Sequence, residues 1–196
     1  MSFSYRSQRA LLALCLSLGL AGSASASTFI RAGLEELAVS NQQIVVGRVI
    51  DAVSYWNDDK SFILTDVTLA TDETIKGEAA GAVTLTLMGG TVGDTSSLIV
   101  GGAELVPGRS YLLFLAPNDL PGAPRVLSVR DHSQGVFEIT AKDGQLRAVS
   151  QASRHALLPD GHGALEAPGG KEGFVLDALI DNLRQTLRRK AANEVR

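Results

Sequence analysis

The serine and histidine residues of this sequence are the side chains that could take part in catalysis. Ser96, Ser97 and Ser133 are candidate nucleophiles, and His132 directly precedes Ser133. Adjacent residues on a strand point to opposite faces, so an extended segment would keep the imidazole of His132 away from the Ser133 hydroxyl. No Gly-x-Ser-x-Gly elbow occurs after residue 26. We therefore expect no catalytic residue and no enzyme, and a small hydrolase that uses a loop Ser and His is the alternative.

His155, Asp160 and His162 come nearest to a set of metal ligands. The two histidines are seven residues apart around a Pro-Asp-Gly turn. Zinc sites favour two histidines at helical i, i+4 spacing together with a further strong ligand. This spacing is more typical of a solvated linker. We expect no resident metal and no cofactor, and these three residues are the candidates if the chain does bind a metal.

The Gly-rich segment 89–97 has the composition of a phosphate-binding loop. No Lys precedes its hydroxyl residues, and no helical pattern follows it. A phosphate loop needs both, because the Lys and the helix N-terminus bind the phosphate groups. The sequence therefore predicts a flexible loop between two strands.

Tyr55 and Trp56 are neighbours at the end of the first long predicted strand, next to the polar turn 57–60. Aromatic rings offer a large apolar contact area at a low cost in conformational entropy, so an exposed pair would suit recognition of a protein or a carbohydrate. Only eight aromatic residues follow residue 26, and the core needs aromatic side chains as well. Tyr55 and Trp56 are our candidate ligand-binding residues, and a place in the core stays open for both.

Residues 1–26 have the pattern of a secretory signal peptide. Arg6 and Arg9 precede an apolar run of about 12 residues, and small residues follow as far as Ala26. The run is shorter than the roughly 20 residues that a membrane-spanning helix needs. We predict cleavage after Ala26 and a secreted or periplasmic protein without stable insertion in a membrane.

The 170 residues after Ala26 contain 16 Lys and Arg, 21 Asp and Glu, and no Cys. Without disulfides the domain has to be stabilised by its hydrophobic core, and a chain of this length can form one. The acidic balance argues against nucleic acid, whose binding needs clustered Lys and Arg. We expect the partner to be a protein or a polysaccharide of the cell envelope or the exterior.

The spacing of apolar residues predicts a mainly β domain over residues 27–150. Leu34, Leu37 and Ala38 have helical spacing and predict a short N-terminal helix. The Asp-Gly pair within 142–145 predicts a type I′ hairpin, and the prolines of 117–124 predict a loop. Alternating or continuous apolar runs predict strands at 43–56, 62–77, 83–87, 98–100, 111–115, 126–129, 136–140 and 146–149.

The remainder of the chain is predicted to form a linker and a helix. Residues 151–172 contain Gly and Pro without a sustained period, which is typical of a linker. Over 173–190, acidic residues come early and basic residues late, as the helix dipole favours. This amphipathic helix is expected to pack on the β domain, with a partner protein as the other way to cover its apolar stripe. The stripe consists of Leu176, Leu179, Ile180, Leu183 and Leu187.

Three segments occur in the order of a known family pattern. They are 36–49, which contains Ile-Val-Val-Gly-Arg-Val, then 65–77, which ends in Lys-Gly, and 108–115, which contains Tyr-Leu-Leu-Phe. Together they resemble the netrin-like domain, the OB-type β-barrel of the tissue inhibitors of metalloproteinases and their bacterial relatives. The resemblance implies an OB-like closed or partly closed β-barrel with a short N-terminal helix and the C-terminal amphipathic helix described above.

The resemblance also implies a secreted metalloprotease as a partner to test. In the inhibitors, an N-terminal Cys held by a disulfide presents its amine and carbonyl to the protease zinc. Here Ser27 would come first, and no Cys holds it. Fixing a loose terminus costs about 1–2 kcal/mol of conformational entropy per residue. We therefore carry over the fold and not the inhibition, and expect an exported, non-catalytic binding module, with a protease-associated accessory protein as its narrower form.

Overall fold

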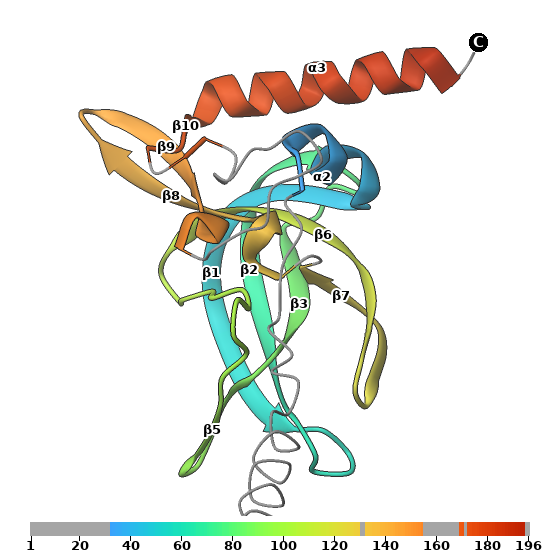
Figure 1. Ribbon diagram of the computed structural model, residues 1–196, viewed down its shortest axis with the longest axis vertical. Coiled ribbons are helices and arrows are strands. Elements are labelled where there is room, and N and C mark those ends of the chain that lie inside the picture. The colour runs from blue at the N-terminus through green and yellow to red at the C-terminus, as the bar shows by residue number, and fades with distance from the viewer. Residues whose placement is uncertain (1–31, 130–131, 155–168, 171, 195–196) are drawn as a thin grey trace, which may run out of the picture.

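The computed structural model describes residues 32–129, 132–154, 169–170 and 172–194, and the described part is mainly β, as predicted (Figure 1). The predicted signal peptide lies outside the described residues. The elements in chain order are α2 (Leu34–Ser40), β1 (Gln43–Trp56), β2 (Ile63–Lys76), β3 (Ala82–Met88), β4 (Gly90–Val92), β5 (Thr95–Ser97), β6 (Ser110–Leu120), β7 (Ala123–Val129), η1 (His132–Gly135), β8 (Val136–Lys142), β9 (Gln145–Ser150), η2 (Gln151–Arg154), β10 (Phe174–Val175) and α3 (Leu176–Glu194), where η denotes a short 3-10 helix.

The main sheet is antiparallel and has eight strands. Its order is β10-β9-β8-β6-β1-β2-β3, and β7 pairs with β6 in addition. Along β6, residues 110–113 pair with β8 and residues 115–120 pair with β7. The short strands β4 and β5 form a separate hairpin.

The sheet is not closed into a barrel, so the closed form of the predicted fold is wrong. β3 lies beside β7, but no ladder joins these two strands in the described part of the chain. Leu87 and Met88 of β3 and Ser128 and Val129 of β7 line a cavity instead. Paired strands lie about 4.8 Å apart, so strands that diverge around such a space cannot exchange backbone hydrogen bonds.

β1 connects the two halves of the fold. Its first half is buried on both faces, as its continuous apolar run predicted: Ile44 and Val46 pack toward the helices, and Val45 and Val49 pack on the opposite face. The register with β2 shifts at three points along β1. Such shifts bend and twist a strand, and they allow the second half of β1 to leave β6.

Two hydrophobic cores lie on the opposite faces of the sheet. The first, which we call the helix core, lies between the sheet and the two helices. It contains Ala32, Leu37, Ala38, Ile44, Val46, Leu112, Phe114, Phe137, Ala148, Leu176, Leu179, Ile180 and Leu183. The second, which we call the inner core, lies on the concave side between β1–β3 and β6–β7, and contains Val45, Val49, Val67, Leu69, Val83, Leu85, Leu87, Tyr111, Leu113, Leu115, Val129 and Val136.

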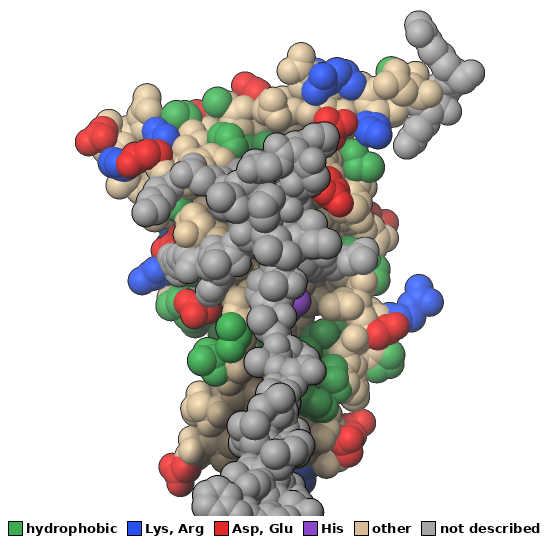
Figure 2. Space-filling model, in the orientation of Figure 1, with side chains coloured by type: hydrophobic (Ala, Val, Ile, Leu, Met, Phe, Trp, Pro, Cys, Tyr) green, Lys and Arg blue, Asp and Glu red, His purple; other side chains and the backbone are tan. Residues whose placement is uncertain are grey.

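The C-terminal helix α3 covers the helix core, where its apolar stripe meets α2, β9 and β10. The amphipathic helix predicted from the sequence is therefore present and packs on the β domain. Arg184 forms an ion pair with Glu73 of β2, which joins the helix to the sheet a second time. The side chains of residues 188–193 are exposed, and Lys and Arg side chains gather on this end of α3 (Figure 2).

The Lys-Gly ending of β2 has a specific structural role. The Lys76 ammonium donates to the carbonyl oxygens of Ala38 and Val39, both at 2.9 Å, and of Asn41 at 2.5 Å. These carbonyls are at the C-terminal end of α2, where the helix leaves its acceptors without intrahelical partners. Lys76 thereby fixes α2 to the sheet.

Replacing Lys76 with Met is expected to lower the free energy of unfolding by about 1.5–3 kcal/mol, because Met keeps the apolar stem and removes the charged donor. Urea denaturation followed by far-UV circular dichroism would measure the change. Lys190→Met, on the exposed end of α3, is the matched control and should change stability by less than about 0.5 kcal/mol. Equal stability of the two variants would contradict this role.

Three local predictions were wrong and one was confirmed. Residues 98–100 form no strand, and segment 89–97 contains the β4–β5 hairpin where a flexible loop was predicted. Segment 117–124 continues β6 and begins β7, with a tight turn between them. The predicted type I′ turn is present, since Asp143 and Gly144 have φ of 52° and 75°.

Candidate binding groove

A groove lies on the concave side of the sheet, beneath the segment that connects β3 to β6. It consists of two adjoining cavities of about 240 Å³ and about 400 Å³. We call the two cavities together the groove. The residues that line both of them are Leu87, Met88, Ile99, Gly102 and Ala103.

The groove has an aliphatic floor and a polar rim. Leu120 and Val129 extend the floor in the smaller cavity, and Val67 and Leu105 do so in the larger one. Serine and threonine hydroxyls from β1, β2, β4 and β5 surround the larger cavity, which has one acidic residue, Glu104, in its lining. Among the described residues, no Phe, Tyr or Trp side chain lines either cavity.

Aliphatic side chains next to the groove are unusually exposed. Leu98 is 82% exposed and Val100 is 74% exposed, and Val106 is 43% exposed. Large aliphatic side chains that gather at the mouth of a cavity mark a surface for contact with another molecule more strongly than the same side chains scattered singly.

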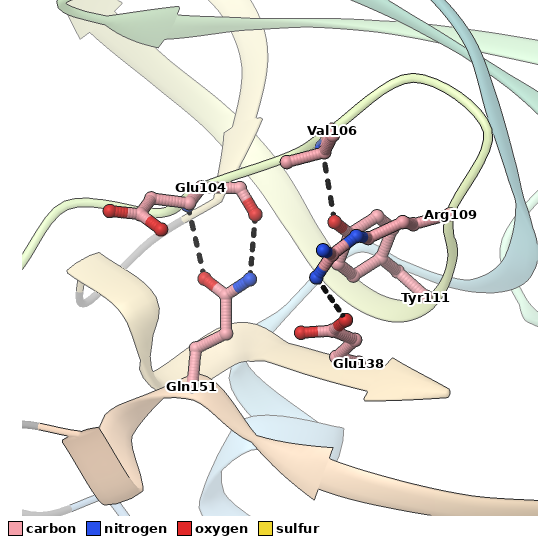
Figure 3. Close-up of polar contacts among 6 residues, drawn as sticks. All are labelled: Glu104, Val106, Arg109, Tyr111, Glu138 and Gln151. Carbon is pink, nitrogen blue, oxygen red and sulfur yellow. Dashed lines mark hydrogen bonds and ion pairs between the residues drawn. The ribbon is translucent and has the colours of Figure 1, made fainter. Parts of the chain in front are cut away.

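One wall of the groove, the segment 98–109, is held by side chains of β6, β8 and η2 (Figure 3). The Gln151 amide makes two hydrogen bonds to the backbone of Glu104: it accepts from the N–H at 3.0 Å and donates to the carbonyl at 2.6 Å. Further along, the Val106 N–H donates to the Tyr111 hydroxyl at 3.1 Å. The Gln151 amide thus acts as a strand would, because it satisfies a donor and an acceptor of the same residue.

The same wall carries an ion pair. Arg109 Nη1 lies 2.6 Å from Glu138 Oε1, and the Glu138 side chain is only 11% exposed (Figure 3). A carboxylate removed from water in this way needs a charged donor to offset its lost hydration. The pair joins the start of β6 to β8, and it fixes the position at which segment 98–109 meets the sheet.

The opposite wall is held by hydroxyl groups. Ser54 Oγ and Thr65 Oγ1 lie 2.9 Å apart, and Thr65 donates to the Gly89 carbonyl at 2.6 Å. Gly90 has a φ of +130°, and a Cβ there would lie 2.3 Å from each of these two hydroxyl oxygens. Only glycine fits at this position, so the β4–β5 hairpin approaches β1 and β2 closely.

Replacing Gln151 with Leu is expected to lower the free energy of unfolding by about 1–2 kcal/mol, because the Glu104 N–H and carbonyl lose their hydrogen bonds to the Gln151 amide. Hydrogen exchange would show faster exchange at the Glu104 amide, and denaturant unfolding would give the change in stability. Gln145→Leu, at an exposed position in the β8–β9 hairpin, is the control and should leave both quantities unchanged. An unchanged Glu104 amide in Gln151→Leu would contradict the role assigned to this side chain.

The two aromatic candidates do not form one joint surface. Tyr55 and Trp56 are both partly buried, and as adjacent strand residues they point to opposite faces of β1. The Tyr55 hydroxyl donates to Asp66 Oδ1 at 3.2 Å, and Thr86 donates to the same oxygen at 2.7 Å. Partial burial and the Asp66 carboxylate raise the pKa of the Tyr55 hydroxyl, which therefore stays a donor at neutral pH. Neither ring lines the groove, and their role in binding stays a prediction.

The hydrolase candidates are divided between the two cavities. Ser96 and Ser97 line the larger cavity, and His132 lines the smaller one. The Ser133 side chain is buried, and its N–H donates to the Gly101 carbonyl at 3.1 Å. No hydrogen bond among the described side chains joins a serine to a histidine as a nucleophile and base would require.

The three metal candidates, His155, Asp160 and His162, lie outside the described residues. Within residues 32–129, 132–154, 169–170 and 172–194, no group of three or more His, Cys, Asp and Glu is close enough to hold a metal ion. For the same part of the chain, no helix is both long and apolar enough to cross a lipid bilayer.

Comparisons with known proteins identify no relative of this chain. No protein-family model, no curated protein and no solved structure matches it. The groove therefore has to be interpreted from its own geometry. One sequence signal marks it, the apolar run Leu-Ile-Val at 98–100, which predicted a strand and instead lies at the mouth of the groove.

Proposed function

We propose that this chain is an exported, non-catalytic module that binds another protein through the groove. The observation that carries the proposal is the combination of a preformed cavity with aliphatic lining and exposed aliphatic side chains at its mouth, Leu98 above all. Binding sites in proteins are concave and mostly apolar, with a few polar groups that orient the ligand. The hydroxyl groups of the rim supply such polar groups.

A protein partner suits the groove better than a polysaccharide. Sugar rings are commonly recognised by stacking on aromatic side chains, and the described lining contains no Phe, Tyr or Trp. Aliphatic side chains of a peptide would match the floor formed by Leu87, Met88 and Ile99. Hydrogen bonds in which Gln151, Tyr111 and the Ser54–Thr65 pair take part hold both walls before a ligand arrives, which reduces the entropy lost on binding.

The OB-type, netrin-like architecture is part of this proposal. Its support is the arrangement of five strands, in which β1 lies between β2 and β6 while β3 lies beside β7. Export with cleavage after Ala26 is supported by the sequence pattern of residues 1–26. A metalloprotease partner is supported only by the resemblance of three segments, 36–49, 65–77 and 108–115, to the netrin-like domain.

Selection from a library of displayed peptides tests the binding function. The protein without residues 1–26 would be the target, and selection against Ala103→Trp, which places an indole in both cavities, would remove peptides that bind elsewhere. We expect peptides that bind the unsubstituted protein at least tenfold more tightly than Ala103→Trp. Ala192→Trp, on the exposed face of α3, is the matched control and should bind them normally.

A second variant separates binding from folding. Leu98→Asp changes a side chain that is 82% exposed, so the stability of the protein should stay unchanged. The affinity of this variant for the selected peptides should nevertheless fall. Failure to enrich any peptide that depends on Ala103 or Leu98 would overturn the proposed function. Turnover of an activated ester or peptide panel that Ser97→Ala abolishes would replace it with the hydrolase alternative.

A further inference from the structure

The strands that flank the groove separate at a fork. β1 pairs with β6 from Gln43 to Arg48, and the contact continues for one more residue, where the Val49 N–H donates to the Arg109 carbonyl at 2.9 Å and the Gly108 N–H donates to the Val49 carbonyl at 2.8 Å. Beyond Val49, β1 continues to Trp56 with β2 as its ladder partner. No other strand in the described part of the chain pairs with this second half of β1.

The larger cavity of the groove lies in this fork. Ser54 of β1 lines one side of it, and Glu104, Leu105 and Val106 line the other. The β4–β5 hairpin reaches β1 through the Ser54 hydroxyl, which accepts from the Thr91 N–H at 3.3 Å, and β4 pairs with β5 rather than with β1. The free edge of β1 and the aliphatic cavity therefore belong to the same opening.

The hydrogen bonds of β1 show which of its residues turn their backbone groups toward the fork. The Asn57 N–H points to β2, where it donates to the Phe62 carbonyl at 2.9 Å. Backbone groups alternate along a strand, so those of Ala52, Ser54 and Trp56 point away from β2. Ala52 agrees with this assignment, because its N–H donates to the Asp51 carboxylate at 2.9 Å instead of to a strand.

We infer that the partner binds as an extended segment, which adds to the free edge of β1 as a further strand and places an aliphatic side chain in the larger cavity. This inference rests on the proposed function and names its mode of recognition. An added strand would pair with the backbone groups of Ala52 and Ser54, as strand addition does at open sheet edges, and the Ala52 N–H would exchange the Asp51 carboxylate for a carbonyl of the added strand. Its side chains would alternate between the cavity and the outer face, where Ile50 is 57% exposed and Val53 is 53% exposed.

Charge favours a basic segment over a second copy of this chain. Asp51 is exposed at the edge, and among the described residues its carboxylate accepts a hydrogen bond only from the Ala52 amide. Glu104 lines the cavity across the fork. A Lys or Arg beside Asp51 would pair with it, whereas a second copy would bring another acidic edge from a chain whose formal net charge is already −3. The expected occupant is therefore a segment of another protein with alternating aliphatic residues and at least one Lys or Arg.

Methylation of single backbone nitrogens in a selected peptide tests this mode of binding. Each N-methyl group removes one donor and blocks one strand contact. We expect binding to fall about tenfold for methylation at alternate positions and less than about twofold at the positions between them. Hydrogen exchange should slow at Ala52, Ser54 and Trp56 when the peptide is bound. Asp51→Lys should lower the affinity for the same peptide about tenfold. Asp72→Lys, at an exposed position of β2 away from the fork, should leave the affinity unchanged.

The outcomes separate this inference from the proposed function. A peptide that depends on Ala103 and Leu98 but tolerates N-methylation at every position would overturn strand addition and leave the binding function in place. Failure to select any groove-dependent peptide would overturn both the proposed binding function and the inference of strand addition. Concentration-dependent dimers in analytical ultracentrifugation that Asp51→Lys strengthens would assign the edge to a second copy and overturn the inference.

Discussion

Replacing Phe137 with Ala is expected to lower the free energy of unfolding by about 3–5 kcal/mol, which is the range for deleting a fully buried aromatic ring. Phe137 is fully buried in the helix core, and its ring centroid lies 5.7 Å from that of Phe114 and 6.4 Å from that of Phe174. These contacts join β8 to β6 and to β10, so the cavity left by Ala would be bordered by three strands that cannot close over it.

Urea or guanidinium unfolding of the protein without residues 1–26 would measure this loss. Phe62→Ala is the matched control, because the Phe62 side chain is 40% exposed and lies outside both cores. We expect the control to lose less than about 1 kcal/mol. A loss below about 1.5 kcal/mol for Phe137→Ala would contradict the central place given to this ring.

Replacing Gly47 with Ala is expected to destabilise the protein by about 3 kcal/mol or more, at the upper end of the range for overpacking. A Cβ at Gly47 would lie 2.2 Å from the Ala70 carbonyl oxygen and 3.0 Å from the Ala70 carbonyl carbon. Both atoms belong to the backbone of β2, which cannot turn away as a flexible side chain could. The register shift between Val46 and Gly47 brings the two strands this close.

Gly81→Ala is the control for this variant. No atom lies within 4 Å of a Cβ at Gly81, just before β3, so this substitution should be neutral or slightly stabilising. Thermal unfolding of the two variants side by side would give the difference. If the melting temperature of Gly47→Ala matched that of Gly81→Ala, the close approach of β1 and β2 would be wrong.

The sequence allowed most elements of the fold to be predicted where local pattern decides the structure. The continuous apolar run of Tyr111–Leu115 predicted a central strand, and these residues are fully buried or nearly so in β6. The helical spacing of Leu176–Leu187 predicted α3, because an amphipathic stripe has to be covered. In each case the residues within one segment carry the whole signal.

Pro117 shows why the segment 117–124 was misinterpreted. Proline has no N–H and is usually excluded from the interior of a sheet. In this fold β6 has already passed the beginning of β1 at that point, since Leu115 pairs with Gln43 and no β1 residue pairs beyond it. On one edge of β6, Pro117 pairs with Leu127 of β7. On the opposite edge β1 does not extend this far, so the missing N–H of Pro117 costs no hydrogen bond to β1. This edge position depends on the relative lengths of strands far apart in the chain, which no local window contains.

The groove could not be predicted for the same reason. Gln151 is 47 residues from Glu104, and Ser54 is 36 residues from Gly90, yet both pairs shape its walls. The sequence pointed to Tyr55 and Trp56 because aromatic residues stand out locally. Polar side chains such as Gln151 carry no such local signal, and their role depends on the contacts that the folded chain provides.

The helix core contains residues from both extremes of the described chain: Ala32 precedes every strand, and Leu176, Leu179 and Leu183 follow all of them. During synthesis on a ribosome, this layer therefore stays incomplete until α3 has emerged. A copy truncated before residue 176 would lack α3, and the apolar surface of Phe114 and Phe137 would then be exposed to proteases.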